Sequence, residues 1–196
     1  MNKQSGFTLV ELMITLSIAV ILLTVGVPSF STMIQNNRLT SNTNDLVSAL
    51  NLARSEAVTR GVRVTVCKSS DQSTCDTSTT GWEQGWIIFT DENNNAAYNP
   101  SATPAETLLK VHEAMENQIT ATGNSNVANY ISYVASGRSQ LTSGAFQAGS
   151  ISLCDARGAS SASWEILSST GRLRLAQDTN DDGIVDDGNG SNVTCP

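Results

Sequence analysis

The chain has 196 residues, of which 18 are acidic and 11 basic, so its formal net charge at pH 7 is −7. An acidic chain can meet an anionic partner only through a local basic patch. One histidine, His112, and four cysteines without a CxxC pair argue against a zinc site, and no nucleophile–base arrangement is apparent around His112. The composition therefore favours a structural or binding protein over an enzyme.

The first element is a hydrophobic stretch over residues 7–27, in which Glu11 is the only charged residue. Its 21 residues are enough for a helix that crosses the hydrocarbon core of a bilayer. A carboxylate near the centre of such a helix costs about 2.5–3.5 kcal/mol on insertion, and less near an end. Glu11 is therefore a functional candidate; the alternative is a plain anchor that tolerates one acid.

The helical pattern continues beyond Pro28, which we expect to kink or interrupt the helix because it lacks an N–H and its ring clashes with the preceding turn. Apolar or small residues then recur at spacings of three and four, which predicts one packed face. This stripe consists of Leu39, Thr43, Leu46, Leu50, Ala53 and Ala57. Arg60-Gly61 is typical of a helix end, so we expect one long bent helix over residues 7–60.

Short β-branched and aromatic runs follow, separated by turn residues, and predict a β-rich domain. The expected strands cover residues 62–67, 85–90, 107–112, 118–122, 129–135, 150–154, 164–168 and 172–176. The first alternates in polarity, and the second is short, aromatic and predicted to be buried. From Gln177 onward the chain is rich in Asp, Asn and Gly, which predicts a loop.

The run Gly6-Phe7-Thr8-Leu9-Val10-Glu11 resembles the class III signal of type IV pilins and pseudopilins. The resemblance implies that a prepilin peptidase cuts after Gly6, that Phe7 becomes the N-methylated first residue, and that the hydrophobic helix is kept. It also implies that Glu11 pairs with the terminal ammonium of a neighbouring subunit. Two charges that are unfavourable alone in lipid can then neutralise each other. A proline at position 28 fits the same pattern.

Further motifs are similar to those of the GspH/FimT family of type IV pilin-like proteins, and most like a FimT-type minor pilin. They are Leu52-Ala-Arg-Ser-Glu-Ala57, Gly85-Trp-Ile-Ile-Phe-Thr-Asp91, Ser136-Gly-Arg138, Ile151-Ser-Leu-Cys154 and Ser168-Ser-Thr-Gly-Arg172. The implied fold is α+β, a long bent N-terminal helix packed on an antiparallel β-sandwich-like domain. The implied segments are a leader (1–6), a transmembrane or filament-core helix (7–30), an amphipathic helix (31–61) and a periplasmic β-rich domain (62–196).

The resemblance also implies a location and partners. The protein would span the inner membrane once with its domain in the periplasm, and then enter an extracellular pilus with other major and minor pilins. Two other interpretations remain open: a minor pseudopilin of type II secretion without a DNA role, and an adhesion or surface module of the pilus.

All four cysteines lie beyond the hydrophobic stretch, and an exported domain favours disulfides over free thiols. Four cysteines allow three connectivities, which the sequence does not decide. We predict the local pairing, Cys67 with Cys75 and Cys154 with Cys195.

Gly171-Arg172-Leu173-Arg174 is the most informative short motif. In a strand, Leu173 and Leu175 would face the core while Arg172 and Arg174 share the other face. Their separation of about 7 Å is close to that of successive phosphates on a nucleic-acid strand. The motif also resembles the Gly-Arg-x-Arg motif of FimT-type minor pilins that bind DNA in natural transformation.

The resemblance implies weak, non-specific and salt-sensitive DNA binding, with Arg138 and Arg157 extending the patch. No aromatic residue alternates with the basic ones, so base stacking is not expected. The alternative is that both arginines of the motif pair with nearby acids such as Glu165 or Asp178.

The acidic tail resembles the first half of a calcium loop, with Gly183 at the sixth position and Asn189 where a glutamate is needed at the twelfth. We therefore expect no cofactor and a plain Asx-rich turn, and keep calcium as the alternative. Its candidate ligands are Asp178, Asn180, Asp182 and Asp186.

Overall fold

The computed structural model describes residues 6–78, 81–115, 118–187 and 190–195. The chain divides between Asn37 and Arg38 into two compact units, here called unit 1 and unit 2. The expected leader lies outside the described residues except for Gly6.

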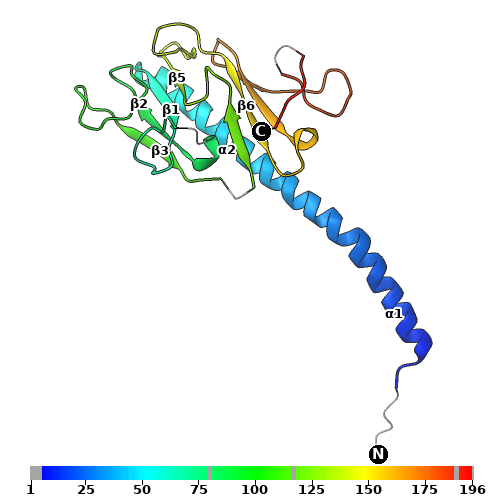
Figure 1. Ribbon diagram of the computed structural model, residues 1–196. Helices are drawn as coiled ribbons and strands as arrows, with labels where there is room; N and C mark the ends of the chain where they lie inside the picture. Colours follow the sequence, from blue (N-terminus) through cyan, green and yellow to red (C-terminus); the bar gives the residue numbers. More distant parts are fainter. Residues whose placement is uncertain (1–5, 79–80, 116–117, 188–189, 196) are drawn as a thin grey trace, which may run out of the picture. The chain divides into compact units, whose positions relative to one another are not determined.

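Unit 1 is helical from Leu9 and contains α1 (Leu9–Ile21), the π-helical segment η1 (Leu22–Gly26) and the first part of α2 (Val27–Arg60) (Figure 1). The sequence predicted that Pro28 would kink or interrupt the helix. The structure shows no interruption there. The wider π-helical turns of η1 lie directly before Pro28, where its ring would meet the preceding carbonyls of a regular α-helix. The departure from α-helical geometry therefore falls before the proline, and the helix continues beyond it.

No described residue of unit 1 is buried, and the helix Leu9–Arg60 is, by length and composition, long and apolar enough to cross a membrane. Its hydroxyl groups are bonded within the helix. Thr15, Ser17 and Thr24 each donate to a backbone carbonyl three or four residues earlier, at 2.8–3.2 Å. These three hydroxyl groups therefore have hydrogen-bond acceptors within the helix itself.

The boundary between the units lies seven residues beyond the expected end of the anchor at residue 30. The cause is that Phe30, Met33 and Ile34 are still exposed, whereas Leu39 is the first buried residue. All six residues of the predicted stripe are buried in unit 2. Helix α2 ends at Arg60 as predicted, and Gly61 takes a positive φ of 70° while its N–H donates to Ala57 O.

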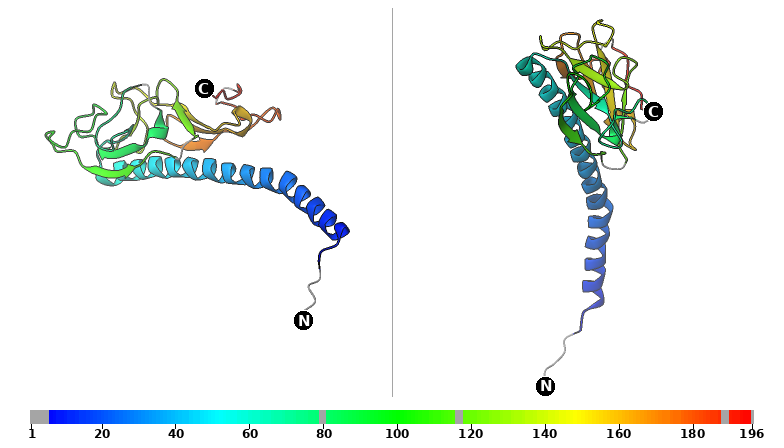
Figure 2. Two further views of the ribbon diagram at one scale, coloured as in Figure 1. Left: turned by 60° about the horizontal axis from the view of Figure 1, so that its bottom comes forward. Right: turned by 90° about the vertical axis from the view of Figure 1, so that its left-hand side faces the viewer.

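Two four-stranded antiparallel sheets make up the rest of unit 2, in the orders β3-β2-β1-β5 and β4-β6-β7-β8. The segment of α2 in this unit runs along them (Figure 2). Each predicted strand is present, with bounds that differ by a few residues. The first sheet contains β1 (Val64–Lys68), β2 (Trp86–Thr90), β3 (Leu108–His112) and β5 (Tyr130–Tyr133). The second contains β4 (Thr120–Gly123), β6 (Gly149–Cys154), β7 (Ser163–Leu167) and β8 (Leu173–Leu175).

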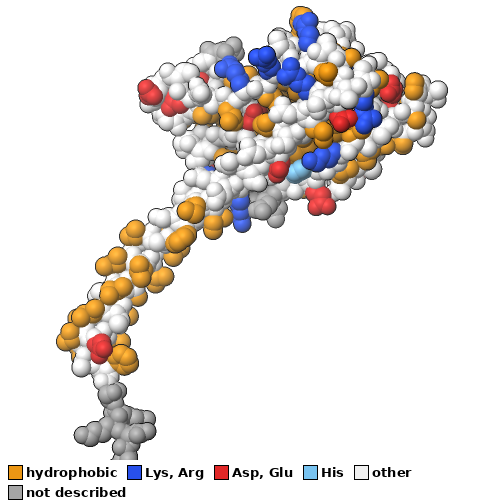
Figure 3. All heavy atoms as spheres, turned by 180° about the vertical axis from the view of Figure 1, so that it is seen from behind, with side chains coloured by type: hydrophobic (Ala, Val, Ile, Leu, Met, Phe, Trp, Pro, Cys, Tyr) orange, Lys and Arg blue, Asp and Glu red, His pale blue; other side chains and the backbone are white. Residues whose placement is uncertain are grey.

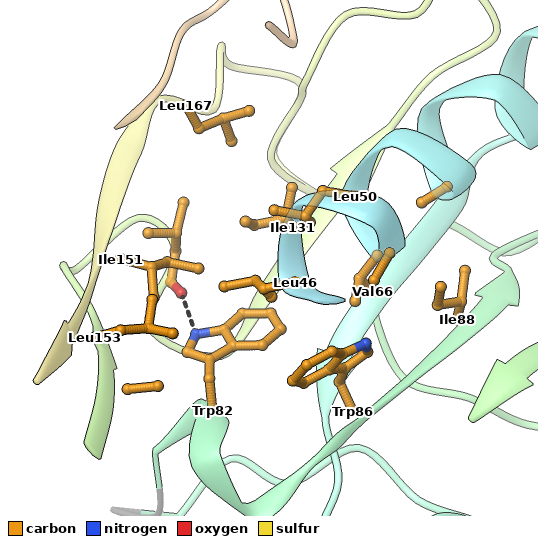
Figure 4. Packing of buried hydrophobic residues seen from close by; sticks show 14 of the residues in the cluster. Leu46, Leu50, Val66, Trp82, Trp86, Ile88, Ile131, Ile151, Leu153 and Leu167 are labelled. Atoms are coloured by element: carbon orange, nitrogen blue, oxygen red, sulfur yellow. Dashed lines mark hydrogen bonds between the residues drawn. The ribbon is translucent and has the colours of Figure 1, made fainter. Parts of the chain in front are cut away.

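Helix α2 and both sheets share one core. Leu46 and Leu50 of α2 lie among side chains from both sheets, and the indole of Trp82 donates to Val127 O at 3.0 Å (Figure 4). Every residue of β1 is buried, although its alternating sequence is typical of a strand with one wet face. A second cluster around Cys67, Ile87 and Phe89 covers the other face of β1 and β2.

Both disulfides form with the predicted local pairing, Cys67–Cys75 and Cys154–Cys195. The second holds the acidic tail to the end of β6. Val193, two residues before Cys195, is buried, and its N–H donates to Val185 O at 3.0 Å. The tail is therefore anchored by a covalent bond and by packing.

Candidate nucleic-acid interface

Two tight turns carry the basic residues that the sequence singled out. The 134–138 turn follows β5, and the 168–172 turn joins β7 to β8. In each, the first residue and the last are joined by a backbone hydrogen bond, Val134 N to Arg138 O at 3.0 Å and Ser168 N to Arg172 O at 2.9 Å. The glycines within them, Gly137 and Gly171, have φ of 73° and 77°, a conformation that glycine adopts without steric cost.

The two turns pack directly against each other, although they belong to different sheets. A Cβ atom on Gly171 would lie only 2.4 Å from Gly137 O and 3.2 Å from Ser139 N, so only glycine fits there. Ser139 Oγ reaches Ser168 O at 3.0 Å. The contact brings the backbones of Arg138 and Arg172 together from positions 34 apart in the sequence.

Arg54 of α2 ties both turns to the helix. Its Nε donates to Gly137 O at 2.8 Å, and its Nη2 donates to Thr170 O at 3.3 Å. Sequence reasoning placed Arg54 off the apolar stripe and gave it no role. The only signal was a basic residue within the motif of residues 52–57, and its carbonyl partners lie 83 and 116 residues away.

The phenol of Tyr133, which lies beside the two turns, adds no negative charge to the junction. Tyr133 lies beside Gly171 and is fully buried. Burial raises the pKa of Tyr133, and the nearby positive charge of Arg54 lowers it only in part. The phenol therefore stays neutral and does not offset the arginines.

Arg172 and Arg174 are both exposed, and the guanidinium group of neither makes a hydrogen bond or ion pair within the part of the chain that the structure describes. The alternative pairing with acids is not seen there. Glu165 is buried, with only 2% of its surface exposed, and Asp178 accepts backbone N–H groups of its own loop. Figure 3 shows exposed Lys and Arg side chains on the face of unit 2 that it draws, with Asp and Glu side chains among them.

Leu173 packs against the core as predicted, but the prediction that Leu175 does so was wrong, because Leu175 is 58% exposed. Strand β8 lies at the edge of its sheet, and Leu175 pairs with Glu165 of β7. Leu175 therefore lies on the core-facing side but beyond the rim of the core.

Arg138 is exposed and joins Arg172 at the junction, as the sequence suggested. Its guanidinium lies 4.5 Å from the ring centre of Phe146. Phe146 was not a candidate, because it lies eight residues further along the chain and only a hairpin brings it back.

Arg157 does not extend this surface, which corrects the expectation from the sequence. Its Nη2 lies 2.5 Å from Asp155 Oδ2, and its Nε also donates to that carboxylate, so its charge is neutralised. The ion pair lowers the pKa of Asp155 and raises that of Arg157. Arg157 lies beyond the end of β6 at which Leu153 pairs with Ser163 of β7. The 168–172 turn lies beyond the opposite end of this strand pair, at which Gly149 pairs with Leu167.

The acidic tail uses its carboxylates in local turns. Asp178 Oδ2 accepts Gly183 N at 2.7 Å, Asn180 Oδ1 accepts Asp182 N at 3.0 Å, and Asp186 accepts the N–H and hydroxyl of Thr179. Within the described ranges, no three His, Cys, Asp or Glu side chains are placed to hold a metal ion. Asn189 lies outside those ranges, so the twelfth position of the calcium loop is not described.

At the other end of the chain, Glu11 takes part in a capping box. Glu11 N donates to Thr8 Oγ1 at 3.2 Å, and Thr8 N reaches Glu11 Oε2 at 3.5 Å. Gly6 and Phe7 are exposed and precede the helix. The carboxylate therefore lies next to the position where cleavage after Gly6 would create a new amine.

Comparison with known proteins finds two family matches along the chain. Residues 1–27 match the prokaryotic N-terminal methylation motif, and residues 42–171 match the family described as type II transport protein GspH. No curated protein sequence matches the chain.

The fold is similar to that of the type IV minor pilin FimU of Pseudomonas aeruginosa in two crystal forms. The TM-scores are 0.53 and 0.50, with 21% and 22% sequence identity. The matches cover 73% and 70% of this chain and 91% of the FimU chain in each case. Because the GspH family match spans most of unit 2 and the methylation motif spans the apolar helix, the chain belongs to the GspH/FimT family of type IV pilin-like proteins.

Proposed function

We propose that this protein is a FimT-like minor pilin that binds DNA without sequence preference during natural transformation. The observation that carries the proposal is the junction of the two turns. Arg54 and the close approach of Gly171 to Gly137 hold Arg138, Arg172 and Arg174 on one exposed surface, in a chain whose net charge is −7. A fixed cluster of unpaired guanidiniums suits a polyanion.

The geometry favours contacts with phosphates over contacts with base edges. Arg172 and Arg174 are two residues apart in an extended segment, so their side chains leave the same face about 7 Å apart. Guanidinium groups bind phosphate oxygens with two parallel hydrogen bonds. Three such contacts would give a slope of about −3 when the logarithm of the association constant is plotted against that of salt concentration.

The acidic remainder of the chain repels DNA, so a single copy binds weakly. Several binding modules acting together raise the apparent affinity without any new contact. The apolar helix supplies the means: after cleavage and methylation by prepilin peptidase, it anchors the domain on the periplasmic side of the inner membrane and then packs with other pilins. A place near the pilus tip would leave the surface formed by Arg138, Arg172 and Arg174, here called the arginine surface, open to incoming DNA.

The test compares two variants that each lose two exposed positive charges. The soluble fragment from Thr32 keeps every buried residue of the described chain, because burial begins at Leu39. In a gel shift at low salt, Arg172→Gln/Arg174→Gln should weaken binding about tenfold, as expected for two lost phosphate contacts. Lys110→Gln/Arg60→Gln removes two exposed charges, that of Lys110 on β3 and that of Arg60, which is paired with Glu56 at the end of α2, and should change binding far less.

The proposal fails if the wild-type fragment gives no shift at low salt. Equal shifts for the wild type and Arg172→Gln/Arg174→Gln would remove these residues from the interface. Equal losses in both double variants would show that only net charge matters.

A second candidate function is that of a minor pseudopilin in type II secretion. It is favoured by the description of the matching family, and by the end of that match at residue 171, immediately before Arg172. The genes beside this one distinguish the two candidates, since a pilus cluster supports the first and a secretion cluster the second.

A further inference from the structure

We propose that the arginine surface selects single-stranded over double-stranded DNA, and that Phe146 is the platform on which an unpaired base stacks. This inference rests on the proposed function, because it names the form of DNA that the same surface takes. It replaces the expectation from the sequence that base stacking plays no part.

Phe146 lies on a short hairpin over residues 140–146 and is 62% exposed. Gln140 and Phe146 form an isolated β-bridge, and Leu141 N donates to Ala145 O at 2.9 Å. Arg63, just before β1, also stabilises the hairpin. Its guanidinium donates to Gln140 O at 2.8 Å and to Gln140 Oε1 at 2.9 Å. Phe146 is therefore an exposed ring on a rigid support.

The ring belongs to the arginine surface. The Arg138 guanidinium lies 4.5 Å from its centre, a geometry that favours a cation–π contact. Between them, Gln147 N donates to Ser139 O at 3.3 Å, and Ser139 also contacts the 168–172 turn. Hydrogen bonds through Ser139 thus connect the neighbour of Phe146 in the chain to the turn that carries Arg172.

Exposure of one aromatic side chain needs no special explanation, but its position does. Within the described part of unit 2, Phe146 is the only aromatic residue in the exposed class, and it lies beside the guanidiniums. The fold gains little from a ring that remains in water, whereas an aromatic face next to basic residues is the arrangement that binds single strands.

The selectivity follows from where each form of DNA places its bases. In a duplex the base faces are stacked on each other inside the helix, so Phe146 has no face to contact there. In a single strand a base can leave its neighbours and stack on the ring, which contributes about 1–3 kcal/mol. Phosphates on either side of that base then lie within reach of Arg138 and Arg172.

The test uses the full chain in detergent micelles and fluorescence anisotropy at low salt. The probes are a thymidine strand of about 20 nucleotides and a duplex of the same length. We expect the wild type to bind the single strand about tenfold more tightly than the duplex. Phe146→Leu keeps an apolar side chain but removes the π face, so its single-strand affinity should fall about 5- to 100-fold while its duplex affinity changes less than about twofold.

Phe146→Trp is the matched control, since it keeps an aromatic face and should retain the single-strand preference. Equal wild-type affinity for the two probes, or a Phe146→Leu variant that still prefers the single strand as the wild type does, would overturn the inference. Either result would leave the proposed function standing, provided that Arg172→Gln/Arg174→Gln still weakens binding. Absence of wild-type binding to both probes would instead refute the proposed function.

Discussion

Replacing Gly171 by alanine tests the contact on which the arginine surface depends. Position 171 has a φ of 77°, and an added Cβ would lie 2.4 Å from Gly137 O, 3.1 Å from Tyr133 Cε1 and 3.2 Å from Ser139 N. The nearest atom is a backbone oxygen, which is itself bonded to Arg54 Nε and cannot move freely. The added methyl group must therefore push the two turns apart.

Gly61, directly after α2, provides the control, because its φ is 70° and no atom lies within 4 Å of its added Cβ. Alanine in the left-handed region costs about 1–2 kcal/mol at either position. Overpacking against fixed atoms adds about 1–3 kcal/mol at Gly171 only. We therefore expect Gly61→Ala to lower the free energy of unfolding by about 1–2 kcal/mol, and Gly171→Ala by about 2–5 kcal/mol.

Urea unfolding of the soluble fragment measures both free energies, and anisotropy with DNA measures the consequence for binding. Because the clash displaces the backbones that carry Arg138 and Arg172, Gly171→Ala should also weaken DNA binding, whereas Gly61→Ala should not. The reasoning is refuted if the two variants lose the same stability, since that would leave the close approach of Gly171 to Gly137 without energetic weight.

Three further predictions concern other parts of the chain. Burial raises the pKa of Glu165 to about 7, whereas the unfolded value is about 4.3. Between these two pH values the native state keeps the proton that the unfolded state loses, so the free energy of unfolding should fall by about 3 kcal/mol from pH 4 to pH 8. Glu165→Gln should remove that fall in urea titrations, and parallel pH curves for both proteins would contradict the assignment. Breaking Cys154–Cys195, which spans 41 residues, should cost about 4 kcal/mol, against about 2.5 kcal/mol for the eight-residue span of Cys67–Cys75, and equal losses would argue against the chain-entropy account. Glu11→Ala should leave the fold of unit 2 unchanged but prevent entry into filaments, as measured by the protein content of sheared pili; normal incorporation would exclude the pairing role.

Local patterns were sufficient to predict the elements of the fold. The apolar stripe from Leu39 to Ala57 is buried residue by residue, because helical spacing alone determines which side chains share a face. The end of the helix at Gly61 and the position of each strand follow from equally local signals. The disulfide pairing also followed from proximity in the sequence.

Features that depend on distant contacts were not predicted. The full burial of β1 requires a second cluster on its outer face, and nothing in residues 62–67 reveals that cover. The exposure of Leu175 depends on where the core ends, which is a property of the whole sheet. Sequence patterns report the periodicity of an element, but the layers on either side are set by the rest of the chain.

In the candidate site, too, local features were predicted and contacts made by the fold were not. Arg172 and Arg174 were found from their spacing, whereas Arg54, Phe146 and the pairing of Arg157 with Asp155 became visible only in the fold. Each of these contacts joins segments from different elements or depends on which carboxylate a turn presents. A basic residue in a sequence therefore identifies a charge, but only the structure tells whether that charge is available.

The apolar helix lies in unit 1 and the arginine surface in unit 2, so we expect filament assembly and DNA binding to be separable. No described residue of unit 1 is buried, and its helix is long and apolar enough to cross a membrane. Unit 2 has a core of its own, and the two turns that carry Arg138 and Arg172 are held by contacts made within unit 2 alone. Because Glu11 and Arg172 share no partner in the described chain, the effects of changing both should add within a few tenths of a kcal/mol in any assay of isolated protein. Coupling between them should arise only in the filament, where many copies of the arginine surface act on one strand of DNA.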